Sequence, residues 1–253
     1  MIRISILGAG PVARFFYREL EQLPKVEIIQ CYNRKGRQLH EAQNQNTIIS
    51  NTNQLKEADL YLIAVADRAI EEVAGQIPFK EVGTVHTSGA TDIDILKEQP
   101  NRGVWYPLQT FSSEATVEAS EIPFCLEASN TSLFQLLKKL SLQISPRVYH
   151  LSSAQRKQLH IAAVFSNNFV NHLMTISHDI CEEHQVPYEL LIPLIKKTMQ
   201  NGLKTLSGTS QTGPAIRKDN KTIENHLKLL PSHQQLIYRI LTEAIQNYYG
   251  EKL

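Results

Sequence analysis

The first fifteen residues of the chain constrain its fold more than any other segment. Residues 2–7, Ile-Arg-Ile-Ser-Ile-Leu, are typical of a short buried strand, and a helix begins near residue 12. The turn between them has the pattern G-x-G-x-x-A, in the order Gly8-Ala9-Gly10-Pro11-Val12-Ala13. In a strand–turn–helix unit, the glycines permit a tight turn and let a pyrophosphate approach the backbone, while the alanine lets the helix pack on the strand. A purely structural turn is the alternative, but the position and context favour a dinucleotide site.

Composition and charge exclude several classes of protein. The chain has 253 residues, enough for one large domain or two modest ones, and its formal net charge of +1 argues against bulk binding to nucleic acid or to an anionic membrane. No apolar run approaches the length of a membrane span, and the N-terminus enters a strand without a signal peptide. The three cysteines, Cys31, Cys125 and Cys181, lie far apart, which favours reduced buried thiols and argues against structural zinc. We therefore expect a cytoplasmic protein without a metal site.

Strand and helix patterns alternate up to residue 150. The expected strands are residues 2–7, 26–32, 47–49, 60–65, 84–86, 104–106, 124–126 and 147–150. The expected helices are residues 12–22, 36–46, 69–76, 92–98 and 133–142. Short apolar strands that alternate with helices predict an α/β fold, with a Rossmann-type parallel sheet covered on both faces.

The pattern becomes all-helical after residue 150. Ser152 and Gln155 have the spacing of a capping box, and the helix that follows continues to about His184. Further helices are expected at residues 188–206, 222–229 and 233–249, with a loop rich in Gly, Ser and Thr at residues 207–220. We therefore divide the chain into a dinucleotide-binding domain, residues 1–150, and an all-α domain for substrate binding and dimerisation, residues 151–253.

The end of the second strand indicates which dinucleotide is bound. NAD-binding Rossmann domains place a carboxylate there for the ribose 2′-OH, but residues 31–37 contain neither Asp nor Glu. Arg34 is well placed for the 2′-phosphate of NADP, with Asn33 as a polar partner and Lys35 or Arg37 adding charge. The sequence favours NADP over NAD, and a solvated basic turn is the alternative.

Two further strand ends belong to the same expected edge of the sheet, where ligands bind in doubly wound folds. Val65 and Ala66 follow the fourth strand and are expected along the cofactor, while Asp67 is expected to cap the next helix. His86 and Ser88 follow the fifth strand, as candidates for contacts with the nicotinamide ribose and the substrate respectively. The alternative for His86 is a buried histidine hydrogen-bonded to backbone.

The cofactor-binding set predicted from the sequence is thus Gly8, Gly10, Pro11, Val12, Ala13, Asn33, Arg34, Val65, Ala66 and His86.

A polar stripe crosses the apolar part of the long helix. His160, Asn167 and Asn171 are spaced i, i+7 and i+11 and share one face at about 100° per residue, with Asn168 beside them. The apolar residues around them should be mainly buried: Ile161, Ala162, Ala163, Val164, Phe165, Phe169 and Val170. Buried polar groups need partners, so the stripe either bonds to neighbouring helices or faces a cleft.

A hydride transfer to a carbonyl or imine needs a proton donor, and His160 is the first candidate because an imidazole titrates near neutral pH. Asn167 or Asn168 would orient the carbonyl or the nicotinamide carboxamide. His86 and Tyr106 are alternative donors, and Asn171 is a substrate candidate. Arg217 could bind a substrate carboxylate or phosphate, or pair with Asp219.

Five motifs together resemble one family. They are A-V-x-D-x-A-I, H-T-S-G-A, Y-P-L-Q-T-F, L-H-x-A-A-V-F-x-N-N and T-G-P-A-x-R-x-D. In this order they resemble Rossmann-like proteins named putative NADP oxidoreductases, which carry a C-terminal helical domain of unknown function. These are similar to deazaflavin-dependent NADP oxidoreductases and pyrroline-5-carboxylate reductases, and more distantly to 6-phosphogluconate and β-hydroxyacid dehydrogenases. The resemblance implies two domains, NADP binding and a homodimer formed through the helical domain, but no particular substrate.

Two departures from the related families limit the mechanism. Tyr106 stands where the family often has a histidine, although a phenol can still hydrogen-bond a substrate oxygen. The β-hydroxyacid dehydrogenases place a catalytic lysine one turn before an asparagine, but here Ala163 and Val164 precede Asn167 and Asn168. That lysine mechanism does not carry over, because Lys157 has a different register.

The sequence therefore predicts an NADP(H)-dependent oxidoreductase that acts, without a metal, on a small carbonyl or imine metabolite bound between the domains. One alternative is a non-catalytic NADP-binding sensor or scaffold. Another is an enzyme that transfers hydride between deazaflavin and NADP.

Overall fold

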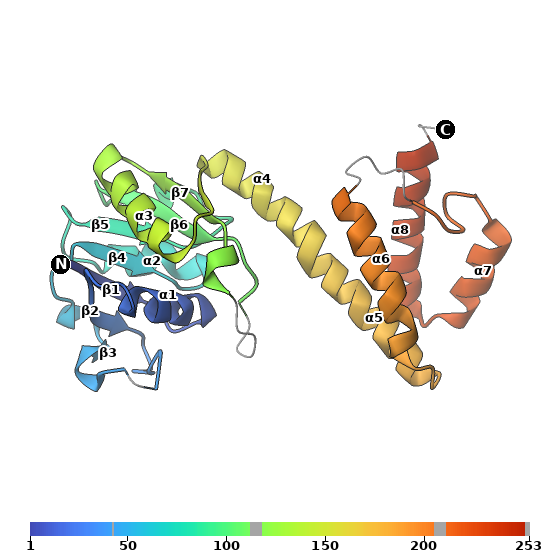
Figure 1. The fold of residues 1–253 in the computed structure, drawn as a ribbon, viewed down its shortest axis with the longest axis horizontal. Coiled ribbons are helices and arrows are strands. Elements are labelled where there is room, and N and C mark those ends of the chain that lie inside the picture. Colours follow the sequence, from blue (N-terminus) through green and yellow to red (C-terminus); the bar gives the residue numbers. More distant parts are fainter. Residues whose placement is uncertain (42, 112–117, 205–210, 251–253) are drawn as a thin grey trace. The chain divides into compact units, whose positions relative to one another are not determined.

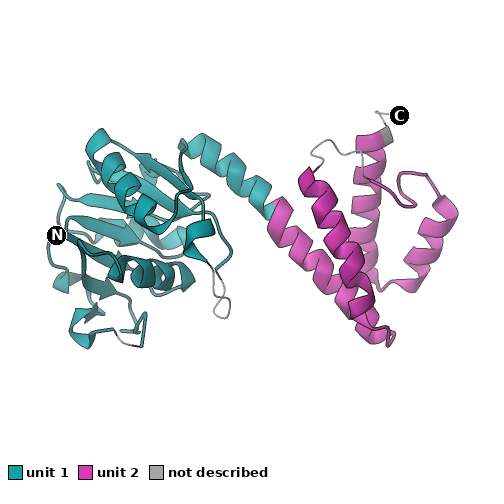
Figure 2. Ribbon diagram, in the orientation of Figure 1, with its two compact units in different colours: residues 1–164 teal, residues 165–253 magenta. Residues whose placement is uncertain are grey.

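The computed structural model describes residues 1–41, 43–111, 118–204 and 211–250. The chain forms two compact units, Met1–Val164 and Phe165–Leu253, shown in different colours in Figure 2. The division falls within the long helical segment and later in the chain than the expected domain boundary at residue 150. The first turns of that segment therefore belong to the first unit. Part of the loop expected at 207–220 lies outside the described residues.

The first unit contains an eight-stranded sheet in the order β3-β2-β1-β4-β5-β6-β7-β8 (Figure 1). Its strands are β1 (Ile2–Leu7), β2 (Val26–Tyr32), β3 (Ile48–Ile49), β4 (Leu60–Ile63), β5 (Gly83–His86), β6 (Arg102–Pro107), β7 (Phe124–Ala128) and β8 (Val148–His150). The order of the first six strands is that of a Rossmann fold, which confirms the predicted class. One neighbouring pair, β6 and β7, is antiparallel, so the sheet is mostly and not entirely parallel.

Strand periodicity divides the core between the two faces of the sheet. Leu60 and Leu62 of β4 belong to one apolar cluster, which also contains side chains of α1 (Pro11–Glu21) and α3 (Thr131–Ile144). Tyr61 and Ile63 belong to the other cluster, together with residues of α2 (Ile70–Gly75). All four side chains of β4 are fully buried, because helices cover both faces of a central parallel strand.

Two of the expected helices in this unit are wrong. In the described part of residues 36–46, the helical structure is limited to the start of a 3₁₀ turn, Gln45–Thr47. Residues 92–98 contain a 3₁₀ turn at Ile93–Leu96 in place of the expected α-helix. Leu39 is the one buried large apolar side chain in the described part of the first segment, and its backbone N–H donates to the side chain of Gln43. An amphipathic helix needs a continuous apolar face, which this segment does not provide.

The long helix begins as expected and then changes its winding. The Ser152 hydroxyl accepts from the backbone N–H of Gln155, and the Gln155 side chain accepts from the backbone N–H of Ser152, which completes the predicted capping box. α4 (Ser153–Ala163) is followed by a π-helical segment, Val164–Phe169, and then by α5 (Val170–Glu183). A π-helical segment places side chains at a different angle per residue from an α-helix. The stripe predicted at 100° per residue therefore does not continue in phase across it.

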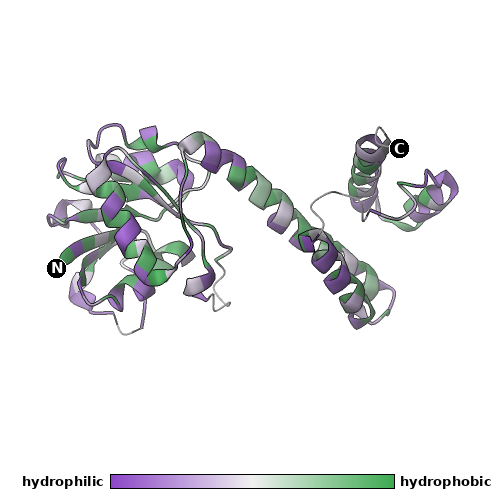
Figure 3. Ribbon diagram, turned by 45° about the horizontal axis from the view of Figure 1, so that its top comes forward, coloured by the Kyte–Doolittle hydropathy of each residue, from purple (hydrophilic) through white to green (hydrophobic). Residues whose placement is uncertain are grey.

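The second unit consists of α5, α6 (Ile192–Lys204), α7 (Asn220–Leu229) and α8 (Ser232–Gly250). Apolar and polar residues alternate along these helices (Figure 3). Among the helices that the structure describes, none combines the length and apolar character needed to cross a lipid bilayer.

The apolar residues around the polar stripe were expected to be mainly buried, and in the single chain this prediction is wrong. Ile161, Phe165 and Phe169 are exposed by 49%, 64% and 49%. The apolar run reflects an uncovered surface of the long helix, and not a core within one chain. A sequence pattern alone does not distinguish these two cases, because both require the same apolar side chains.

Candidate functional site

The first glycine of the turn is required by the backbone itself. Gly8 has φ +136°, a conformation that L side chains rarely adopt, and a Cβ atom there would lie 2.0 Å from the carbonyl oxygen of Ala64. Its N–H donates to the carbonyl of Tyr32 at 2.8 Å. Gly8 thus lets the end of β1 lie tightly between the ends of β2 and β4.

The second glycine is required by neither conformation nor packing. Gly10 is the N-cap of α1 with an ordinary φ of −75°, and no atom lies within 4 Å of the position that a Cβ would take. Pro11 occupies the first helical turn, and Ala13 is fully buried where α1 packs on the sheet. The space beside Gly10 is open to a cavity, as close approach of a phosphate to the backbone requires.

That cavity has a volume of about 710 Å³ and lies along the carboxyl ends of the parallel strands. Its lining comes from the glycine turn, the end of β2, the segment after β4, the loop after β5, and α4: Gly8, Ala9, Gly10, Pro11, Val12, Asn33, Arg34, Lys35, Arg37, Ala64, Val65, Ala66, Asp67, Thr87, Ser88, Gly89 and His160. An adjoining cavity of about 420 Å³ shares Gly8, Asn33 and Arg34 and extends along α2. The volume is within the range of small-molecule sites, on the order of 300–1,000 Å³.

A loop of basic residues closes one side of this cavity. The Asn33 side chain accepts from the Arg37 backbone N–H and donates to the Arg37 carbonyl, both at 2.8 Å. Asn33 is buried and holds the loop, whereas Arg34, Lys35 and Arg37 are exposed at the cavity. Three cations therefore line the position where an NAD-binding domain has a carboxylate.

Val65 and Ala66 line the cavity as the sequence predicted, but Asp67 does not cap the next helix. The 3₁₀ turn Asp67–Ala69 begins after Ala66 and has no side-chain cap. The Asp67 residue lies within this turn and lines the cavity instead.

His86 takes the alternative role that the sequence left open. Its ring is fully buried, Nδ1 accepts from the N–H of Ser88 at 3.1 Å, and Nε2 lies 3.3 Å from the carbonyl oxygen of Asp92. Burial and the nearby charge of Arg156 lower the pKa of His86 from 6.5 to about 4, partly offset by Asp92. The ring stays neutral and shapes the loop after β5, and it does not line the cavity.

Ser88 lines the cavity, but its hydroxyl is used within the loop. It accepts from the N–H groups of Ala90 and Thr91 at 3.1 and 3.0 Å and donates to the Thr91 hydroxyl at 2.9 Å. These hydrogen bonds close a local turn in the loop after β5.

His160 and Tyr106 meet across 54 residues of sequence. The Tyr106 hydroxyl lies 3.3 Å from His160 Nδ1, and a Cβ on Gly89 would lie 2.6 Å from Tyr106 Cζ and 2.8 Å from His160 Nδ1. Burial raises the pKa of Tyr106 to about 12, so the phenol keeps its proton near neutral pH and is available as a donor. Of the four predicted catalytic residues, the structure brings these two together.

The other predicted site residues belong to the second unit. Asn167, Asn168 and Asn171 are exposed residues of the long helix, and Arg217 is exposed before α7. Asp219 caps α7 by accepting from the Thr222 backbone N–H and hydroxyl, and within the described residues it forms no ion pair with Arg217.

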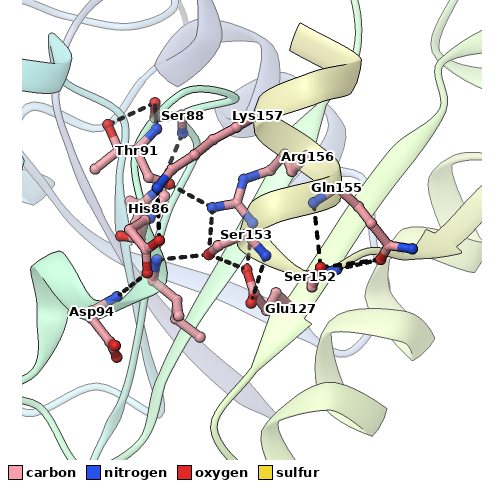
Figure 4. Close-up of polar contacts among 12 residues, drawn as sticks. His86, Ser88, Thr91, Asp94, Glu127, Ser152, Ser153, Gln155, Arg156 and Lys157 are labelled. Carbon is pink, nitrogen blue, oxygen red and sulfur yellow. Dashed lines mark hydrogen bonds and ion pairs between the residues drawn. The ribbon is translucent and has the colours of Figure 1, made fainter.

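Sequence reasoning missed the polar network around the buried Arg156, which is drawn in Figure 4. Arg156 of α4 pairs with Glu127 of β7 at 2.5 Å and donates to the carbonyl of Thr91 at 2.5 Å. One signal could have found it. Arg156 follows directly after the capping box, in the first turn of a helix, where the helix dipole disfavours a cation. An arginine there implies a specific acidic partner.

Known proteins resemble this chain in both sequence and fold. Residues 122–245 match the family model described as a domain of unknown function, DUF2520. A putative NADP oxidoreductase from Bacteroides fragilis is 32% identical, with 97% of this chain and 98% of that chain covered and a TM-score of 0.83. Protein TM1727 from Thermotoga maritima is 24% identical, with 98% and 99% covered and a TM-score of 0.69. A comparison with curated protein sequences finds no match.

The chain therefore belongs to the family of the Bacteroides protein, which is described as a putative NADP oxidoreductase, and residues 122–245 of this chain form the part that matches DUF2520. The fold extends to more distant proteins. A reductive aminase from Aspergillus terreus, solved with NADPH and ethyl levulinate, has a TM-score of 0.68 at 11% identity, with 98% of this chain and 94% of that chain covered. The match to the Bacteroides protein confirms the predicted family, and these more distant structures agree with the predicted fold class.

The neutral ring of His86 predicts a pH-dependent stability. In the unfolded chain the imidazole takes up a proton below its usual pKa of 6.5, whereas in the folded protein it does so only below about 4. The free energy of unfolding should therefore fall as the pH drops from 6.5 to 4, by about 3 kcal/mol from this group. Urea unfolding at pH 7 and 4.5 should show a smaller pH dependence for His86→Gln than for the wild type. Equal dependence in the two proteins would contradict the assignment.

Proposed function

We propose that the cavity at the glycine turn binds NADP(H). The pyrophosphate would lie against Gly10 and the N-terminus of α1, where no side chain fills the space. The 2′-phosphate would be held by Arg34, with Lys35 and Arg37 beside it. The adjoining cavity along α2 offers room for the adenine half. NAD fits less well, because no carboxylate stands at residues 31–37 for its ribose 2′-OH.

We further propose that the protein transfers a hydride between NADP(H) and a small carbonyl or imine metabolite. The observation that carries this proposal is that His160 lines the same cavity as the glycine turn and the basic loop. Bound NADP(H) would supply or accept the hydride. His160 would pass its Nε2 proton to the substrate oxygen or nitrogen while Nδ1 takes up the phenol proton of Tyr106, so that the imidazole stays neutral and the phenol is reprotonated from solvent. The printed names of two similar proteins support the class: a putative NADP oxidoreductase from Bacteroides fragilis and a reductive aminase from Aspergillus terreus solved with NADPH.

Tyr106 would fix the ring of His160 for this step. A protonated phenol can donate to Nδ1, which leaves the imidazole proton on Nε2. In the second unit, Asn167 or Asn168 would orient the substrate carbonyl or the carboxamide, and Asn171 and Arg217 would bind polar groups of the substrate. These four residues keep the roles that the sequence assigned to them.

A non-catalytic NADP sensor or scaffold is the second candidate. It is favoured by Ala163 and Val164, which stand where related dehydrogenases have a catalytic lysine. It is also favoured by His86, whose ring is occupied by backbone partners and does not reach the cavity.

We also propose a homodimer formed through the helical unit, in the cytoplasm. Leu236 and Ile240 of α8 are 61% and 56% exposed, one turn apart on one helix face. They stand beside an apolar groove of about 360 Å³ between α5, α7 and α8. Exposed apolar surface of this kind is typical of subunit interfaces. The three cysteines are free and buried, which fits a reducing compartment.

The NADP proposal predicts a selective effect at Arg34. Arg34→Ala should weaken NADPH by about 10- to 100-fold, because it removes a charge-assisted contact worth about 1.5–3 kcal/mol, and should change NADH affinity less than about threefold. Fluorescence titration with both cofactors measures this. Lys25→Ala, an exposed cation that does not line the cavity, is the matched control. Equal losses for NADPH and NADH would refute the assignment.

The oxidoreductase proposal predicts turnover that depends on His160. NADPH absorbance, followed with a panel of keto acids, cyclic imines and deazaflavin, should reveal a substrate class for the wild type. His160→Gln should then lower kcat by about 100-fold or more and leave NADPH affinity within about threefold. Retained turnover in the variant would remove His160 from the reaction. Tight NADPH binding with no turnover on any substrate would favour the sensor.

The dimer proposal predicts a solution mass of twice 28.7 kDa for the wild type, measured by light scattering after gel filtration. Leu236→Glu combined with Ile240→Glu should give the monomer, because each carboxylate would be buried in an apolar interface. Leu142→Glu, at an exposed apolar position of α3 in the first unit, should stay dimeric. A wild-type mass of 28.7 kDa at micromolar concentration would exclude the dimer.

A further inference from the structure

Arg156 is a buried cation at a position where a positive charge is energetically unfavourable. Its side chain is 1% exposed, although it lies in the first turn of α4, where the helix dipole is positive. A buried charge is tolerated only when it is paired and hydrogen-bonded. Arg156 must therefore be held by fixed partners, and these partners define where the beginning of α4 can lie.

The partners come from three separate elements of the first unit (Figure 4). Arg156 Nη1 donates to Glu127 of β7 at 2.5 Å, and Nη2 donates to the Thr91 carbonyl at 2.5 Å and to the Ser153 hydroxyl at 3.1 Å. Glu127 also accepts from the backbone N–H and the hydroxyl of Ser153, at 2.8 and 2.7 Å. The Ser153 hydroxyl accepts in turn from the N–H of Ile93 at 3.0 Å. The ion pair thus ties β7, the loop after β5 and the first turn of α4 together.

The loop and the helix that this pair joins are the ones that hold the proposed proton donor. Gly89 of the loop packs so closely on His160 and Tyr106 that a Cβ would not fit. Arg156 and His160 are four residues apart on α4, so they lie one turn apart on the same face. A shift of either the loop or the helix would change the distance between His160 and the Tyr106 hydroxyl.

We propose that the buried Arg156–Glu127 ion pair is a positioning device, which holds His160 against Tyr106 and directs its imidazole to the cavity. Arg156 and Glu127 act through His160 and do not themselves line the cavity. The catalytic consequence rests on the proposed function, but the effect on the His160 ring does not.

The chain offers a matched control at the next residue. Lys157 of α4 pairs with Asp92 of the same loop at 2.8 Å, but both side chains are more than 40% exposed. An exposed pair contributes little to the geometry, because solvent screens it and its side chains remain mobile. Lys157→Gln removes an ion pair between the same two elements without touching the buried one.

The test uses the full-length protein labelled with ¹⁵N-histidine, and it reads the tautomer of His160 by NMR, with the signals assigned through His160→Gln. In the wild type and in Lys157→Gln, the proton should be on Nε2 in a single tautomer. Glu127→Gln keeps the size of the side chain but replaces one acceptor oxygen by a donor NH₂, so it must lose a contact with Ser153 or Arg156. Glu127→Gln and Arg156→Met should give mixed tautomers, and Arg156→Lys should restore the signal in part.

NADPH affinity should stay within about twofold of the wild type in Glu127→Gln, since the cofactor lining is unchanged. An unchanged His160 signal in a folded Glu127→Gln protein would overturn the proposal, and this variant decides the question if Arg156→Met does not fold. The readout needs no substrate. A changed tautomer together with a silent substrate panel would retain the positioning role and reject the oxidoreductase. With a substrate in hand, kcat should fall about tenfold or more in Glu127→Gln and remain unchanged in Lys157→Gln.

Discussion

The carbonyl of Ala64 occupies the space that a side chain at residue 8 would need, and most of the site follows from this contact. β1 pairs with β2 on one side and with β4 on the other, so the strand order reverses at β1. Such a reversal opens a crevice at the carboxyl ends of the strands. Because Gly8 lets the backbone turn tightly there, α1 begins at the crevice, and the basic loop after β2 and the segment after β4 reach it from either side. Gly10 then leaves the space beside the turn unfilled.

The parts of this arrangement that the sequence predicted are local. The glycine turn, the capping box and the basic loop each lie within about seven residues, and each depends on backbone rules that act over such a distance. The helix expected at 36–46 failed for the opposite reason. Its polar composition permits a helix, but among the residues of this segment that the structure describes, Leu39 is the one apolar side chain packed into the core. Helices of this length are stabilised mainly by the face they bury.

The parts that the sequence did not predict depend on long-range contacts. His160 meets Tyr106 across 54 residues, and Arg156 meets Glu127 and Thr91 across 29 and 65. The polar stripe was predicted from α-helical geometry, which the π-helical segment at Val164–Phe169 interrupts. His160 lies in the first compact unit and Asn167, Asn168 and Asn171 in the second. The α-helical periodicity that grouped these residues in the sequence does not hold across the π-helical segment.

The antiparallel direction of β7 determines where the counter-charge of Arg156 lies. Val104 of β6 pairs with His86 on one side and with Glu127 on the other, so Glu127, the residue before the last of β7, lies level with the end of β5. The carboxylate that neutralises Arg156 is carried by a strand with hydrogen-bonded neighbours on both sides. The counter-charge therefore belongs to the sheet, and the beginning of α4 is attached to it through the hydrogen bonds of Ser153 and Arg156 to Glu127.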